Sequence, residues 1–149
     1  KQRNKFLEKE LKEFSILFLI INNLDIFRKK IELISEITFS TDMMMEFKQK
    51  LIEYLLSEQF FDRKKLRPED FEERFKTIID KVNMNAPVKI ISANKKEEEI
   101  FGIFNEITKE IKKIDLYKKI ELLEDRVSLN LDEKLYSELL SLRNQLKSG

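Results

Sequence analysis

The longest stretch without a helix-breaking residue constrains the fold of this chain more than any other feature. It starts at Asn94-Lys95-Lys96-Glu97, which has the form of a helix capping box, and runs to about Ser128 with only a tolerable Gly102 inside it. The predicted helix has about 33 residues and is roughly 50 Å long. A compact body of about 90 residues is only about 30 Å across, so this helix must extend beyond the body that the preceding residues form.

The apolar residues of this helix change sides near Asp115. At 100° per residue, two apolar sets lie roughly 190° apart on the helix surface. The first set is Ile100, Phe104, Ile107, Ile111 and Ile114, and the second is Leu116, Ile120, Leu123 and Val127. The helix therefore either continues straight and packs against two bodies or kinks at Asp115. Both alternatives predict a helical bundle from residues 1–92 and a smaller subdomain from residues 93–149.

The second apolar set has a matching partner at the end of the chain. A last helix is predicted to begin at Asp132 or Glu133, with leucines at 4-3-4 spacing. These leucines are Leu135, Leu139, Leu142 and Leu146. Because they form a seam like that of the preceding helix, we expect the two helices to pair as an antiparallel hairpin.

Helical spacing and helix-start signals also dominate the first 92 residues. We predict a first helix from about Gln2 to Ile21, a short second helix from Asp25 to about Ser35, and a third after the N-cap candidates Ser40, Thr41 and Asp42. Pro68 is placed to open a further helix that ends in the break at 83–87. Since the chain has only two Gly and two Pro, we predict an all-α fold: a bundle, a long helix and a C-terminal antiparallel hairpin.

The composition argues against most enzyme chemistry. Without His or Cys, the chain lacks imidazole and thiolate metal ligands and the usual neutral-pH proton shuttle, so we expect no catalytic residue, metal, cofactor or small-molecule substrate. Its carboxylate clusters lie at predicted helix starts, where they stabilise the helix dipole.

Lys plus Arg (29) nearly equals Asp plus Glu (28), so bulk charge does not favour nucleic acid or membranes. With no signal-peptide pattern and a first residue that is Lys, the chain resembles a piece of a larger, cytoplasmic protein.

Two surface features are candidates for binding. A two-helix hairpin has one internal interface, yet further side chains lie off the leucine seam or at the hairpin tip. They either contact the first body or bind another protein, and we predict that they bind a partner. These residues are Leu129, Leu131, Tyr136, Leu140 and Arg143.

The second feature is a basic cluster that follows Phe60 and Phe61. It comprises Arg63, Lys64, Lys65 and Arg67. Basic and aromatic side chains together can contact phosphates and stack on bases, so these four residues are candidate nucleic-acid contacts. The cluster is short and is followed at once by acidic residues, a pattern that favours a solvated loop.

The order of these patterns resembles a known family. The stretch from Phe14 to Phe27, then Glu36 to Met43 leading into residues 47–56, looks like the opening of the C-terminal domain of bacterial DnaG-type replicative primases. The ending, from Ile100 to Arg143, is similar to the closing hairpin of that family. The resemblance covers nearly the whole chain. It departs from the family at Asn23-Leu24, where His-Pro is usual.

The resemblance implies a non-catalytic interaction domain that binds the N-terminal domain of the replicative helicase and recruits primase to the replication fork. Zinc binding and RNA polymerisation would belong to other domains of the parent primase. The bundle would modulate the helicase, and the hairpin would supply most of the affinity. Two alternatives remain: the N-terminal domain of the helicase itself, whose bundle is similar, and a helical module that binds single-stranded nucleic acid through the basic cluster.

Overall fold

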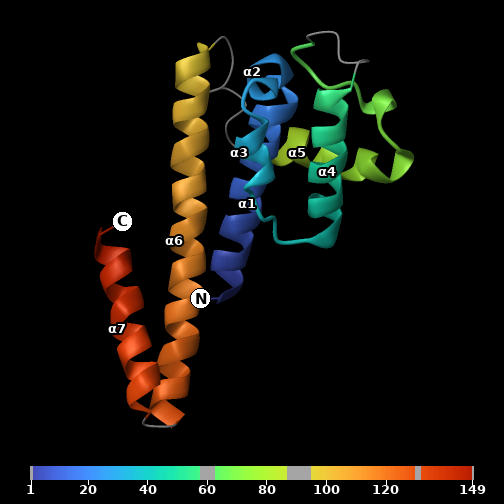
Figure 1. Cartoon of the computed structure of the whole chain (residues 1–149). Coiled ribbons are helices and arrows are strands. Elements are labelled where there is room, and N and C mark those ends of the chain that lie inside the picture. The colour runs from blue at the N-terminus through green and yellow to red at the C-terminus, as the bar shows by residue number, and fades with distance from the viewer. Residues whose placement is uncertain (1, 58–62, 87–94, 130–131, 149) are drawn as a thin grey trace. The chain divides into compact units, whose positions relative to one another are not determined.

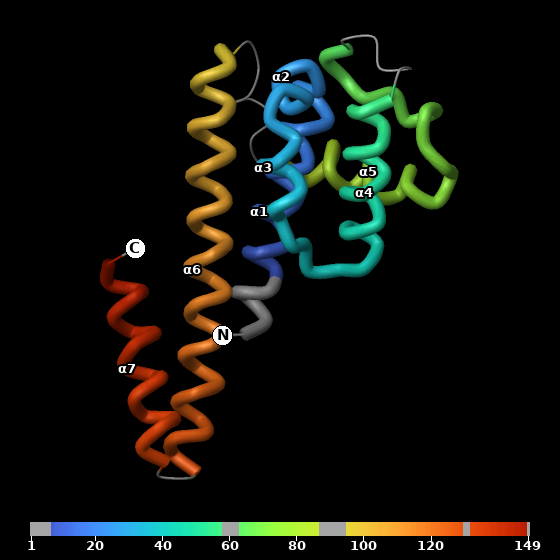
Figure 2. Tube along the Cα trace, in the orientation of Figure 1, coloured from blue at the N-terminus to red at the C-terminus, as the bar shows by residue number. Residues whose placement is uncertain are grey.

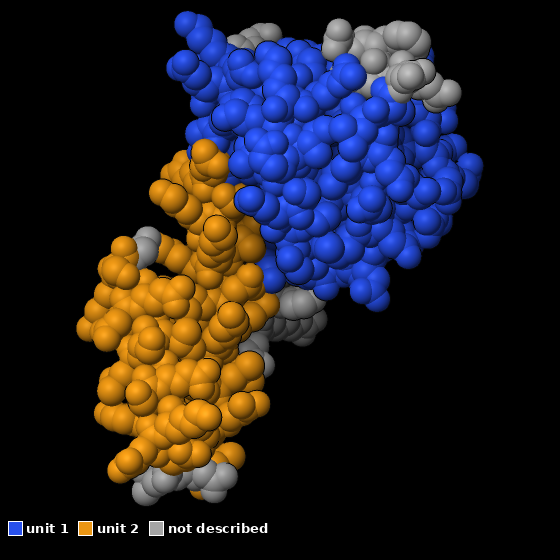
Figure 3. Space-filling model, in the orientation of Figure 1, with its two compact units in different colours: residues 1–104 blue, residues 105–149 orange. Residues whose placement is uncertain are grey.

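All regular elements in the described part of the chain are helices. The computed structural model describes residues 2–57, 63–86, 95–129 and 132–148, and side chains from residue 7 onward. The chain divides into two compact units, residues 1–104 and residues 105–149, which Figure 3 colours separately. The sequence-based division at residues 92 and 93 falls before the long helix, whereas the two units divide within it. The difference arises because the first turns of this helix pack in unit 1.

Unit 1 is a bundle of short helices around one long one (Figure 1). Its elements are α1 (Gln2–Ile21), α2 (Leu24–Arg28), α3 (Ile31–Ser35), α4 (Asp42–Leu56), two 3₁₀ turns (Pro68–Asp70 and Glu73–Phe75), α5 (Lys76–Asn85) and the start of α6 (Glu97–Leu129). The ring of Phe27 contacts the rings of Phe101 and Phe104, with centroids 5.4 and 5.2 Å away. These contacts place the first turns of α6 in the core of unit 1.

Helix α1 forms the centre of unit 1, and its predicted bounds are confirmed. Its last six residues, 16–21, are all apolar and all buried, as expected of a helix turn that is apolar on every side. The helix ends where the Asn23 side chain donates a hydrogen bond to the carbonyl of Leu19 (2.9 Å), so the polar turn satisfies the helix end. Helix α1 packs against α2 and α5, which can be followed in Figure 2.

The predicted helix from Asp25 to Ser35 is instead two helices of five residues. The backbone of Lys30 leaves the helical region (φ −135°, ψ 54°), which separates α2 from α3. The buried ammonium of Lys48, on α4, donates to the carbonyls of Ser35 and Ile37, both at 2.9 Å. These bonds satisfy carbonyls at the end of α3 and hold α3 against α4.

The start of α4 is confirmed in detail. Thr41 is the N-cap, and its hydroxyl accepts a hydrogen bond from the backbone N–H of Met44 at 3.1 Å. Phe47, Leu51 and Leu55 bury one face of the helix completely.

The single helix predicted to start at Pro68 is wrong. Pro68 opens a 3₁₀ turn that ends at Phe71, whose backbone is extended, and a second short turn precedes α5. The break allows the Phe71 ring to stack on Tyr54, with centroids 5.4 Å apart and planes at 20°. Helix α5 then continues to Asn85, two residues past the predicted break at Asn83. Val88–Ser92, whose sequence is compatible with a short strand or a helical turn, and the predicted capping residue Asn94 lie outside the described residues.

Unit 2 is the predicted antiparallel hairpin. Helix α6 is an uninterrupted helix of 33 residues that passes through Asp115, which decides between a continuous and a broken helix. Helix α7 (Glu133–Ser148) begins after Asp132, whose side chain accepts a hydrogen bond from the N–H of Lys134 (2.9 Å). Ile120, Leu123 and Leu139 form the buried core between α6 and α7. Leucines and one valine of the predicted seam pack around that core: Leu116, Val127, Leu135, Leu142 and Leu146.

The predicted change of sides on α6 is confirmed by burial. Before Asp115 the first apolar set is buried, and after it Ile120 and Leu123 are buried in the hairpin core. Within the described ranges, no helix is at once long and apolar enough to cross a bilayer.

Neighbouring leucines of α7 allow a stability test of the seam. Leu139 is 2% exposed and Leu140 is 41% exposed. Leu139→Ala should lower the free energy of unfolding of the hairpin by about 2–5 kcal/mol, because it leaves a cavity in a small core. The matched Leu140→Ala removes the same atoms from the surface and should cost less than about 1 kcal/mol. Urea unfolding followed by circular dichroism measures both, and equal losses would contradict the seam.

Candidate functional site

The residues predicted to bind a partner lie on unit 2, and those that are described are exposed. Leu129 at the end of α6 is 83% exposed, and Tyr136 and Leu140 on α7 are 51% and 41% exposed. Leu131 lies outside the described residues. Tyr136, Leu140 and Arg143 are four and then three residues apart, so they follow one face of α7, beside the buried seam. We call these three residues the tyrosine face.

Arg143 joins the tyrosine face to α6. Its guanidinium donates to the carboxylate of Glu124 at 3.0 Å, and both side chains are about half exposed. Tyr117 precedes Glu124 by seven residues, or two turns, so it lies on the same side of α6 and is 44% exposed. The sequence reasoning missed Tyr117. Its position seven residues before Glu124 places it on the same side of α6. This spacing indicates a place beside the tyrosine face only once Arg143 is known to pair with Glu124.

An exposed apolar face of this kind suits recognition of another protein. Tyrosine and arginine, which flank an exposed leucine on this helix, are residue types enriched among those that carry most binding energy. The exposed pair of Arg143 and Glu124 contributes little to stability, but it orients the guanidinium beside the apolar side chains.

In the basic cluster, two of the four candidate nucleic-acid contacts already have a partner. The Arg63 guanidinium donates to the Asp70 carboxylate at 2.7 Å, and Arg67 approaches the same oxygen at 3.5 Å. The Tyr54 hydroxyl also donates to Asp70, at 3.2 Å. The single charge of Asp70 therefore offsets one of the four positive charges of the cluster, which lowers its attraction for phosphate groups.

The two lysines of the cluster are exposed, and the backbone around them is hydrogen-bonded to α1 and α2. The carbonyl of Lys64 accepts the N–H of Leu24, and the N–H of Leu66 donates to the carbonyl of Ile21, both at 2.8 Å. The residues Lys64 and Lys65 are both exposed. Phe60 and Phe61, the predicted stacking residues, lie outside the described residues.

The same network borders a pocket of about 650 Å³ in unit 1. Its lining mixes both signs of charge with aromatic rings: Lys50, Arg63, Arg67, Glu53, Asp70, Glu72, Tyr54, Phe71 and Phe75. Burial, and secondarily the nearby carboxylate of Asp70, raise the pKa of Tyr54 above its ordinary value. A phenol that stays protonated beside a paired carboxylate acts as a structural hydrogen-bond donor rather than a base.

Carboxylates of the segment that precedes α5 are paired with basic side chains. Glu72 accepts from Arg74 at 2.9 Å, and Glu73 pairs with Lys76 at 3.2 Å. Among residues 2–57, 63–86, 95–129 and 132–148, no three acidic side chains come together in a way that could hold a metal ion.

Comparisons of the chain with protein families, with curated proteins and with solved structures give no match. The geometry of the two units, together with the order of the sequence patterns, is therefore the basis for inferring function.

The Tyr54 network allows a test by titration. In Asp70→Asn the negative charge beside the phenol is lost while Arg63 remains, so the tyrosinate becomes more favourable and the pKa of Tyr54 should fall. Tyrosinate absorbance measured against pH reports this change, and Tyr54→Phe assigns the titration among the three tyrosines. An unchanged or higher pKa would contradict the role given to Asp70.

Proposed function

We propose that this chain is a non-catalytic interaction domain, similar to the C-terminal domain of bacterial DnaG-type primases, that binds the N-terminal domain of the replicative helicase. The observation that supports the proposal is the tyrosine face on a hairpin that is a compact unit of its own. The order of a bundle, a long helix and an antiparallel hairpin agrees with what the resemblance implies. In this proposal the parent protein carries primer synthesis in other domains.

The hairpin supplies the binding energy in this proposal. Tyr136 and Leu140 offer apolar area on one face, and Arg143 offers five N–H donors beside them. An interface built from these residues would leave the buried seam untouched. Leu129, and the undescribed Leu131, extend the apolar surface at the hairpin tip.

The bundle has a different part in the proposal. Its core contains the fully buried rings of Phe27, Phe47 and Phe75. It would modulate helicase activity once the hairpin has bound, as the resemblance implies.

A double substitution on the tyrosine face tests this assignment. Tyr136→Ala with Leu140→Ala should weaken binding to the helicase N-terminal domain by about 30-fold or more, because truncating a hot spot costs about 2 kcal/mol. Calorimetric titration measures the affinity, and circular dichroism confirms that the helices persist. The control is Glu138→Ala with Ser141→Ala, two exposed positions of α7 on another side of the helix. An unchanged affinity in the Tyr136 and Leu140 variant would overturn the hairpin assignment.

The assembly state separates this proposal from the helicase alternative. A primase-type domain should sediment as a monomer at micromolar concentration, whereas the N-terminal domain of the helicase itself would assemble into trimers or hexamers. Analytical ultracentrifugation of the isolated chain decides between them. Assembly into a ring would favour the alternative that this chain is the N-terminal domain of the helicase.

A further inference from the structure

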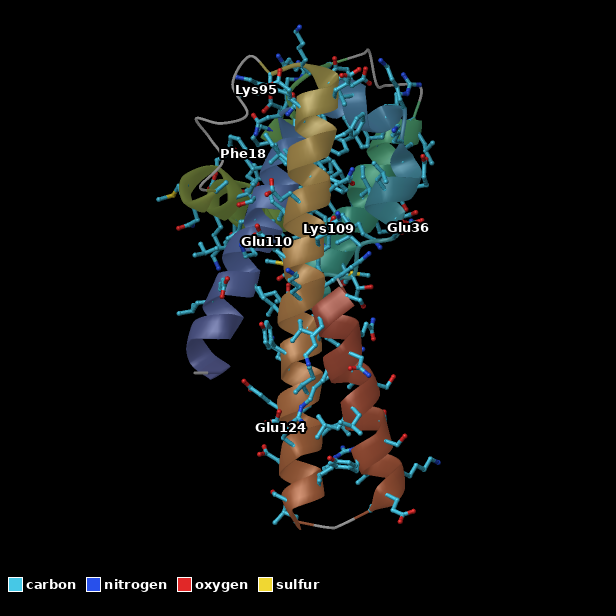
Figure 4. The ribbon with its side chains drawn as sticks, turned by 90° about the vertical axis from the view of Figure 1, so that its left-hand side faces the viewer. Phe18, Glu36, Lys95, Lys109, Glu110 and Glu124 are labelled. Carbon is cyan, nitrogen blue, oxygen red and sulfur yellow. The ribbon has the colours of Figure 1, made fainter. Side chains whose placement is uncertain are left out.

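A groove lies on the hairpin where the leucine seam of α7 ends. It has a volume of about 460 Å³, and all its lining residues belong to unit 2. They come from two helices: Lys109, Lys112, Lys113, Asp115, Leu116 and Lys119 from α6, and Leu142, Gln145 and Leu146 from α7. Figure 4 shows α6 and α7 side by side, with Lys109 on α6 near the end of α7. We call this the lysine groove.

The groove combines an apolar floor with a basic rim. Leu116, Leu142 and Leu146 are half-buried seam residues, and their exposed parts form the floor. The four lysines are exposed, and within the described part of the chain none of their ammonium groups forms an ion pair. Asp115 is the single carboxylate of the lining, and it has another interaction. The rim therefore carries an excess of three positive charges, four from lysine against one from Asp115.

The spacing of the lysines indicates how large the ligand is. Lys109 and Lys119 are ten residues apart, which is about 15 Å along the helix. One carboxylate or phosphate group can reach only part of such a row. Several negative charges distributed over two or three helical turns would match all of it.

The apolar floor indicates what the ligand carries besides negative charge. A nucleic-acid backbone would match the lysine row, but it has no aliphatic group to place on three leucines. An acidic amphipathic helix presents both chemistries, with apolar side chains on one face and carboxylates beside them.

We propose that the lysine groove is a docking site for an acidic amphipathic segment of another protein. Leucine-sized side chains of the segment would cover Leu116, Leu142 and Leu146 and extend the hairpin seam. Carboxylates of the segment would pair with the lysine rim. The basic rim would speed association and set the orientation, while the floor would supply affinity that salt does not remove.

This site is separate from the tyrosine face. At 100° per residue, Gln145 lies about 140° from Leu140 and about 180° from Tyr136 around α7. The groove and the tyrosine face therefore occupy opposite sides of the seam. Binding at the groove does not rest on the proposed helicase interaction, and the two can be tested with different variants.

The test uses the full chain and a fluorescent helical peptide of about twelve residues, with leucines along one face and glutamates beside them. Lys112→Gln with Lys119→Gln should weaken peptide binding by about tenfold in fluorescence anisotropy. The matched control is Lys134→Gln with Lys147→Gln, which removes the same charge from exposed α7 positions outside the groove and should leave the affinity unchanged. Leu146→Ala should also weaken binding, with helix content checked by circular dichroism.

A second peptide, with serines in place of the leucines and the same charge, tests the floor. It should bind at least tenfold more weakly, and the remaining binding should disappear at high salt. Equal affinity of the two peptides would overturn the proposal, since attraction would then be only electrostatic. Three other results would overturn the proposal as well. They are tighter binding of a single-stranded oligonucleotide through Lys112 and Lys119, self-association that depends on these two lysines, and no peptide binding at millimolar concentration.

Discussion

One helix supplies apolar side chains to two cores, and the rest of the structure depends on this constraint. Helix α6 contributes Phe104 to the core of unit 1 and, five turns later, Leu123 to the core of unit 2. The apolar positions change sides at Asp115 while the backbone stays helical. Because the seam residues of α6 follow one another on a continuous helix, their spacing sets the register of the hairpin seam. Helix α7 can then pair in only one register without exposing leucines.

The apolar spacing was sufficient to predict the elements that bury a continuous stripe. Helix α1, helix α6 and the seam of α7 follow from periodicity alone, since apolar residues recur at helical spacing along each buried face. The breaks at Lys30 and Phe71 could not be predicted in this way. The extended backbone at Phe71 accompanies a contact with a distant residue, because its ring stacks on Tyr54. Helix α3 is likewise held by a distant residue, because Lys48 donates to the carbonyls of Ser35 and Ile37. A local pattern carries no information about such partners.

The same distinction applies to the candidate sites. The exposure of Tyr136 and Leu140 follows from their angle to the leucine seam, so the sequence was enough to predict that they are exposed. The pairing of Arg63 and Arg67 with Asp70 could not be predicted from the sequence, because Asp70 was interpreted as an acidic residue at a helix start. The lysine groove was hidden as well. Each lysine alone is typical of a solvated helix face. Only the structure shows that the lysines line the same groove as Leu116 and the end of α7.

The small core of unit 2 has a consequence for the dynamics of the hairpin. The cluster between α6 and α7 has three buried residues, Ile120, Leu123 and Leu139, whereas every one of the last six residues of α1 is buried in unit 1. The free energy of local opening should therefore be lower for α7 than for α1. We expect the amide protons of α7 to exchange with solvent through local opening, and those of α1 only through unfolding of the whole bundle. A protein that covers either side of the seam would slow exchange along all of α7, including amides that it never touches.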